Sequence, residues 1–347
     1  MWMKINKTAV FLLLFLALPS AVFPEAVGKV TKAYPNDDIL EITYYQDGQE
    51  TAREVFDNDG NAHKAGKIPD GKVKTFDEKG RLEKEIFFLN NMREGQAVLY
   101  YEGGAKKVES VYKQDKRDGI QKLYYENGAL KAEMNYIDGK LQGLFREYYQ
   151  SGKINAERNY NSGSEEGISK EYYESGELQW EYRYIDGKLE GMSREYYKNG
   201  RIKEEQTYAN NKLNGRTTEY DEESGKQANE YLYYNGLING LAKSSTPEDA
   251  YYCESEWKDG VRHGVEKAYM SGELKRSSDF KDGMRDGLTV IYLQGVYDNE
   301  SGKIEESWKN DRLNGVTRKF DGSGKLIEEW NYKDNLRLNP PKQHPKI

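Results

Sequence analysis

Short aromatic runs alternate with glycine-containing polar breaks along most of this sequence. Between residues 143 and 166, the runs GLFREYY and INAERNY are separated by QSGK and followed by NSGSEE. Aromatic-rich runs of this length, bounded by Gly with Asn, Asp or Ser, predict strands joined by tight turns. No stretch after residue 30 is long enough, without interruption, for a stable helix. The pattern predicts a series of β-hairpins.

The hairpin pattern recurs every 24 residues. A glycine opens each unit, at a spacing of 24 residues from Gly71 to Gly215 and of 23 to 28 residues from there to Gly315. An aromatic residue stands seven positions before each unit glycine from Gly95 onward. A fixed period of this length is the signature of a repeat array, in which neighbouring units bury surface against one another.

We therefore predict an all-β fold, an elongated single-layer antiparallel sheet of about eleven hairpin units, twisted or curled. The array is expected to span residues 71–338. Residues 27–70 are expected to form a degenerate N-terminal capping unit, and residues 339–347, with three prolines, a flexible tail.

One assumed register places opposite charges across six of the hairpins. If Tyr125 pairs with Leu130 across the loop 126–129, a basic and an acidic residue face each other in six units. Such pairs set the register of a sheet more than its stability. The predicted structural ladder consists of Lys74–Glu85, Lys122–Glu133, Arg146–Glu157, Lys170–Glu181, Arg194–Glu205 and Arg318–Glu329.

The same register sorts the side chains onto two faces. One face is apolar and aromatic, and we assign its tyrosines Tyr136, Tyr160, Tyr184 and Tyr208 to packing. The other face carries the charged ladder with one tyrosine per unit. Because Tyr offers contact area and a hydroxyl at low entropic cost, the predicted binding residues are Tyr124, Tyr148, Tyr172 and Tyr196.

Composition supports a folded chain and limits its partners. The mean hydropathy is −0.98, yet 29 Tyr and 34 Gly are present, and disordered polar chains are poor in aromatic residues. The net charge of −7 argues against nucleic acid or an anionic membrane as the main partner, since both attract basic surfaces.

The N-terminus resembles an export signal. Lys4 and Lys7 precede an apolar run, TAVFLLLFLAL, that is shorter than the roughly 20 residues needed to span a bilayer. Residues 1–26 are therefore predicted to be a signal peptide, cleaved after Ala21 or Ala26, and the protein is expected to be exported without a transmembrane anchor. The single cysteine, Cys253, cannot form an internal disulfide.

Candidate catalytic and metal-binding groups are sparse. His63, His263 and His344 fall in separate units, and the acidic residues of the ladder recur at the repeat period, as structural pairs do and a single catalytic pair does not. The acidic turn 57–61 lacks the spacing of an EF-hand loop. The sequence predicts no catalytic residue, no metal site and no cofactor.

The unit G-x-x-x-x-Y-Y-x-x-G-x-[LI]-x-x-E-x-x-Y-x-D-G-[KR]-x-x-G resembles the MORN repeat, in the bacterial variant of YwqK-type proteins, over residues 71–338. Members of that family are often labelled antitoxins. The resemblance implies an elongated single-layer sheet that binds proteins or lipids, usually without catalysis.

Three functions are compatible with the sequence. The leading hypothesis is an exported, non-enzymatic interaction protein that binds another protein, with antitoxin-like immunity as a special case. The second is binding of carbohydrate or cell wall, with Trp180 and rows of tyrosines stacking on sugar rings. The third is hydrolysis by a carboxylate pair, Glu248 and Asp249, in a unit that departs from the repeat.

Overall fold

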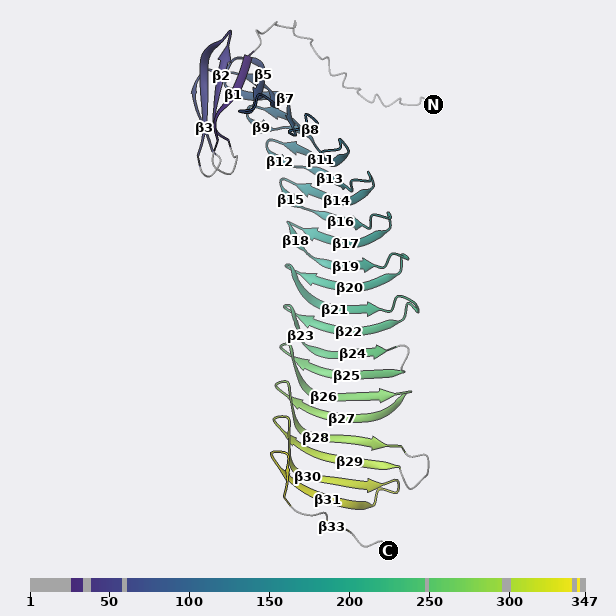
Figure 1. The fold of residues 1–347 in the computed structure, drawn as a ribbon. Helices are drawn as coiled ribbons and strands as arrows, with labels where there is room; N and C mark the ends of the chain where they lie inside the picture. Colours follow the sequence, from purple (N-terminus) through teal and green to yellow (C-terminus); the bar gives the residue numbers. More distant parts are fainter. Residues whose placement is uncertain are drawn as a thin grey trace, which may run out of the picture. The chain divides into compact units, whose positions relative to one another are not determined.

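The computed structural model describes residues 26–33, 39–57, 61–246, 250–294, 301–338 and 342–343. In these residues every regular element is a β-strand (Figure 1), which confirms the all-β prediction. Consistently, no helix long and apolar enough to cross a membrane occurs in the same residues. The chain divides into two compact units, Met1–Gly128 and Ala129–Ile347.

Within its described residues, the first unit contains ten strands. They are β1 (Ala26–Ala33), β2 (Ile39–Gln46), β3 (Gln49–Phe56), β4 (Ala62–Gly66), β5 (Gly71–Phe76), β6 (Leu82–Leu89), β7 (Met92–Tyr100), β8 (Lys106–Lys113), β9 (Lys116–Arg117) and β10 (Gly119–Tyr124).

The N-terminal cap has more strands than the sequence analysis predicted. Residues 27–70 hold most of β1 and all of β2, β3 and β4, which pair in order as antiparallel neighbours. Strand β1 also runs parallel to β5, with Ala26 opposite Val73. This parallel pair departs from the predicted purely antiparallel sheet. It covers the outer edge of the first repeat hairpin, which would otherwise present unpaired backbone groups.

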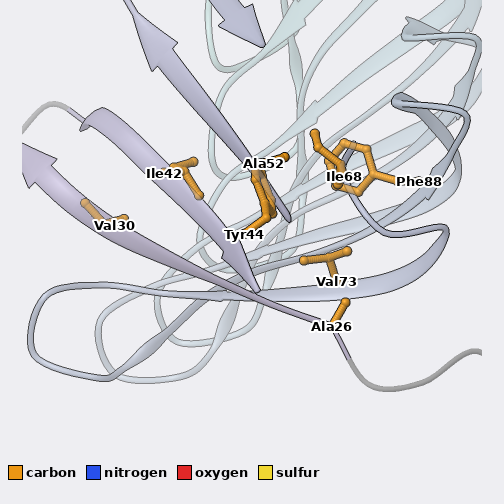
Figure 2. Packing of buried hydrophobic residues seen from close by; sticks show 8 residues of the cluster. All are labelled: Ala26, Val30, Ile42, Tyr44, Ala52, Ile68, Val73 and Phe88. Atoms are coloured by element: carbon orange, nitrogen blue, oxygen red, sulfur yellow. The ribbon is translucent and has the colours of Figure 1, made fainter. Parts of the chain in front are cut away.

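A conventional hydrophobic core lies beneath this cap. Figure 2 shows its members, which come from β1, β2, β3, β5, β6 and the segment before β5. The rings of Tyr44 and Phe88 meet edge to face with centroids 6.0 Å apart. The buried cluster consists of Ala26, Val30, Ile42, Tyr44, Ala52, Ile68, Val73 and Phe88.

The second unit is a single layer of hairpins that follow one another in chain order (Figure 1). Its strands are β11 (Leu130–Ile137), β12 (Lys140–Leu141), β13 (Gly143–Tyr148), β14 (Ile154–Asn161), β15 (Ser164–Glu165), β16 (Gly167–Tyr172), β17 (Leu178–Ile185), β18 (Lys188–Leu189), β19 (Gly191–Tyr196), β20 (Ile202–Ala209), β21 (Lys212–Tyr220), β22 (Gln227–Tyr234), β23 (Leu237–Ile238), β24 (Gly240–Thr246), β25 (Tyr251–Lys258), β26 (Val261–Met270), β27 (Glu273–Lys281), β28 (Met284–Leu293), β29 (Gly302–Lys309), β30 (Arg312–Asp321), β31 (Leu326–Lys333), β32 (Leu336–Arg337) and β33 (Lys342–Gln343).

In four hairpins of the second unit, β13–β14, β16–β17, β19–β20 and β30–β31, the loop differs from the prediction by one residue. In β13–β14, Tyr148 lies opposite Ile154, with a register shift after Glu147. The predicted register would have placed Tyr149 opposite Ile154. A β-bulge adds one residue to one strand only. The charged pairs lie on the other side of this bulge, so their predicted register is unaffected.

The turns between hairpins are tied to one another. Asp186 and Gly187 have φ values of 50° and 74°, the left-handed pair of a type I′ turn. The Gly187 N–H donates at 2.8 Å to the backbone oxygen of Glu165, in the short strand β15 that follows the preceding turn. Where Asn211 replaces this glycine, its side-chain oxygen also accepts the Leu189 N–H at 2.7 Å. These turns therefore bind the short strand that follows the turn before them.

The second unit is held without a large aliphatic core. Its buried apolar residues, among those the structure describes, are Ala132, Met134, Ala156, Ala242 and Ala268. One face instead places a small buried residue opposite an aromatic one in several hairpins. Ser169 lies opposite Tyr182 and Thr217 opposite Tyr231. We call this side the aromatic face, and it matches the predicted distribution of apolar contact along the sheet.

Candidate functional site

The opposite side, the ladder face, carries the predicted charged pairs. The strand register places five of them directly opposite: Lys74–Glu85, Arg146–Glu157, Lys170–Glu181, Arg194–Glu205 and Arg318–Glu329. The sixth predicted pair is Lys122–Glu133, and its members belong to the two different compact units. In the first unit Lys122 lies opposite Glu109, and in the second Glu133 lies opposite Arg146.

Three arginines of the ladder make close ion pairs. The Nε atoms of Arg146 and Arg194 lie 2.8 Å from Glu157 and Glu205, and that of Arg318 lies 3.0 Å from Glu329. Lys170 Nζ is farther from Glu181, at 3.8 Å. Because the pairs are partly exposed, each adds little stability by itself, and their main effect is to fix register.

Tyrosines of the next hairpin complete the ladder. The Tyr172 hydroxyl donates to Glu157 at 3.1 Å, and the Tyr220 hydroxyl donates to Glu205 at 3.0 Å. The hydrogen bond from Arg146, followed by that from Tyr172, holds the pKa of Glu157 below its usual value. Partial burial, followed by the hydrogen bond to Glu157, raises the pKa of Tyr172.

These contacts involve the tyrosines that the sequence analysis proposed for binding. Tyr124 donates its hydroxyl to Glu109 as Tyr172 does to Glu157, and Tyr196 lies beside Arg194 and Glu181. Tyr148 also has an interaction partner. Because these tyrosine hydroxyls are hydrogen-bonded within the ladder, mainly the faces of their rings would be available to contact a ligand. Their binding role stays a prediction.

A second tyrosine row was not predicted. In four Tyr-Tyr pairs, the hydroxyl of the second tyrosine donates to a backbone oxygen of the tyrosine that stands 23 residues later. That acceptor stands at the register shift, where the ladder of backbone bonds is interrupted. The distances are 2.7 Å for Tyr101 to Tyr124, 2.6 Å for Tyr149 to Tyr172, and 2.8 Å for Tyr173 to Tyr196 and for Tyr197 to Tyr220. The recurrence of the Tyr-Tyr pair every 24 residues is the sequence signal for it.

Exposed aliphatic residues line the ladder face at the repeat period. Each stands directly after a unit glycine and two residues before the ladder position of its strand, so both positions point to the same face. We call this set the aliphatic row: Leu144, Ile168, Met192, Leu241 and Leu288, whose exposed fractions range from 39% to 49%. The ladder position is basic in the first four strands and is Val290 in the strand of Leu288. The sequence analysis missed it because it asked which positions bury apolar groups, not which expose them.

The remaining candidates for chemistry are dispersed. His63 lies 3.5 Å from Asp57, and His263 lies 3.5 Å from Asp282. Burial raises the pKa of the Cys253 thiol, which disfavours the reactive thiolate. No group of His, Cys, Asp and Glu in the described residues could hold a metal ion. Glu248, Asp249 and His344, like residues 1–25 of the predicted signal peptide, lie outside those residues.

Comparisons with known proteins give one family match. The model of the MORN repeat variant matches residues 69–90, 117–138, 141–162, 165–186, 189–210 and 313–334. No curated protein matches the chain. A solved structure titled "Crystal Structure of TcdB2-TccC3 without hypervariable C-terminal region" is similar over 88% of this chain, at 11% identity and a TM-score of 0.17. The chain spans 20% of the length of that structure's chain.

Proposed function

Because the chain is a MORN-repeat protein, we propose that it binds another protein through its ladder face and catalyses no reaction. The aliphatic row carries this proposal. Five exposed aliphatic side chains recur on one face, one per hairpin, in five of the repeats. Exposed apolar groups in register, bordered by polar residues, are typical of protein interaction sites.

The charged ladder beside the row would give such a contact its specificity. Arg146, Glu157 and their equivalents are held in fixed positions by the ion pairs and tyrosine hydrogen bonds described above. A preordered polar surface loses little side-chain freedom on binding. A partner with apolar groups spaced by two strands, roughly 10 Å, would fit several repeats at once.

We place this interaction outside the cytoplasm and assign the chain to the YwqK-type group. The signal-like N-terminus supports export. Neutralising an exported toxin, as an immunity protein does, is the special case that the family label suggests.

The test removes three members of the aliphatic row and is designed to keep the fold. Two tagged proteins beginning at Val22 would be used to capture partners from the native organism after mild crosslinking. One is the parent, and the other is the row variant, Leu144→Ser, Ile168→Ser, Met192→Ser. A matched control, Ile137→Ser, Ile185→Ser, Leu237→Ser, removes three equally exposed apolar side chains near the turns. We expect a stoichiometric protein with parent and control only. Equal capture by the row variant would reject the proposal.

Carbohydrate binding is the second candidate, because aromatic rings stack on the other face. Trp180 and Tyr182 lie parallel, with centroids 5.3 Å apart and 7° between their planes, and their flat surfaces are half-buried. The test is cosedimentation with cell-wall material. If the parent and the row variant cosediment and Trp180→Ala does not, the result favours carbohydrate binding over protein binding.

A further inference from the structure

The outer edge of β31, in the last hairpin of the second unit, is paired with a short strand, β33. Strand β33, Lys342–Gln343, pairs with the outer side of β31 and places Gln343 opposite Glu328 and Lys342 opposite Glu329. These two residues belong to the segment predicted as a flexible tail. In the structure these two residues pair with β31.

The register of β33 is that of an internal repeat. In the array, Glu157 lies opposite Lys170 of the next hairpin, and Glu181 lies opposite Arg194. Lys342 occupies the same position relative to Glu329. The segment therefore takes the place of the first strand of a further repeat.

As a strand, this segment is a poor match to its internal equivalents. Internal first strands such as β16 and β19 have six residues, and of this segment the structure describes the two residues of β33. The neighbouring sequence carries Pro340, Pro341 and Pro345, and proline lacks the N–H that a sheet edge needs.

The carboxylates on the outer edge of β31 indicate which side chains a better-matched strand would carry. Glu328 and Glu329 are consecutive on β31, so their carboxylates point to opposite faces of the sheet. In the internal repeats a ladder glutamate accepts from an arginine of its own hairpin and from a tyrosine of the next, as Glu157 does. For Glu329 the structure records the bond from Arg318 at 3.0 Å.

We propose that the outer edge of β31 is a strand-binding site for an extended peptide, and that Lys342–Gln343 is a displaceable occupant of it. The peptide would carry two consecutive basic residues, opposite Glu329 and Glu328, followed by a tyrosine. Main-chain hydrogen bonds to β31 would supply affinity and the alternating side chains would supply specificity. This site is a sheet edge and contains no member of the aliphatic row, so either proposal can fail alone.

The test uses the full chain and labelled peptides in fluorescence anisotropy. The probe is the chain's own segment 167–173, GISKEYY, carrying Glu171→Lys, and the control peptide carries Lys170→Glu. We expect the parent to prefer the probe. Lys342→Glu places like charges opposite each other and weakens the tail, so probe affinity should rise by up to about fivefold.

Charge reversal distinguishes this site from general attraction. In Glu329→Lys the preference should invert in favour of the control peptide. Glu181→Lys, the same ladder position inside the array with strands on both sides, should leave both affinities unchanged. The proposal is overturned if Glu329→Lys keeps the parent's preference, or if Lys342→Glu produces a dimer without binding the probe, which would assign the edge to a second copy.

Discussion

The hydroxyl of Tyr172 donates to the carboxylate of Glu157, fifteen residues earlier and one hairpin away, at 3.1 Å. Glu157 also accepts from Arg146 on its own hairpin at 2.8 Å. One carboxylate therefore joins two repeats, and the charged ladder acts between hairpins as well as within them.

Removing this hydroxyl should weaken the array locally. We expect Tyr172→Phe to destabilise by about 1 kcal/mol, the usual contribution of one hydrogen bond. Amide hydrogen exchange in β14 and β16 would measure the loss. Tyr234→Phe, at an exposed turn position, is the control and should change nothing. Unaltered protection in β14 would show that the bond has no structural role.

Replacing Glu204 should stabilise the second unit. Glu204 lies opposite Glu195 on one strand and Glu219 on the other. Burial, and then the neighbouring carboxylates, raise its pKa. A raised acid pKa means that the folded state holds the proton more tightly, so stability falls as pH rises above the pKa of the unfolded chain.

Alanine stands at the equivalent positions 132 and 156. Glu204→Ala should therefore raise the urea midpoint at pH 7. A gain of a few tenths to about 1 kcal/mol is expected from removing opposed like charges, and it should shrink toward pH 4. Glu205→Ala, on the other face, removes the acceptor of Arg194 and Tyr220 and should destabilise. A loss of stability in both variants would contradict this account.

The turn at Asn211 should be sensitive to its side chain. Asn211 has a φ of 65°, which costs other residues about 1 kcal/mol or more, and it accepts the Leu189 N–H. Asn211→Ala should lower stability by about 1–2 kcal/mol. Asn211→Gly, which restores the residue of the preceding turn, should cost less, and equal losses would mean that the conformation is unimportant.

If the chain is exported as proposed, its mature form should retain Ala26. This residue is 1% exposed in the core and lies opposite Val73, so cleavage after it would shorten β1. We predict processing after Ala21, to be checked by N-terminal sequencing of the exported protein. A mature chain beginning at Val27 would show that β1 tolerates the loss.

The repeat itself could be predicted from sequence because its signals are local. Unit glycines and charged pairs such as Arg194–Glu205 lie within one hairpin, where a single assumed register reaches both partners. The Tyr173 hydroxyl bond to the Tyr196 carbonyl escaped prediction because it joins different hairpins. So did the pairing of β1 with β5, since no periodic pattern links Ala26 to Val73.

The ties between neighbouring hairpins of the second unit have a mechanical consequence. Those described above span 15 to 23 residues of sequence, so stretching the chain from its ends would load one hairpin at a time. The unit should extend under force as a staircase, each step releasing about 80 Å of chain for about 24 residues. Such a molecule yields gradually, in the manner of an extensible tether.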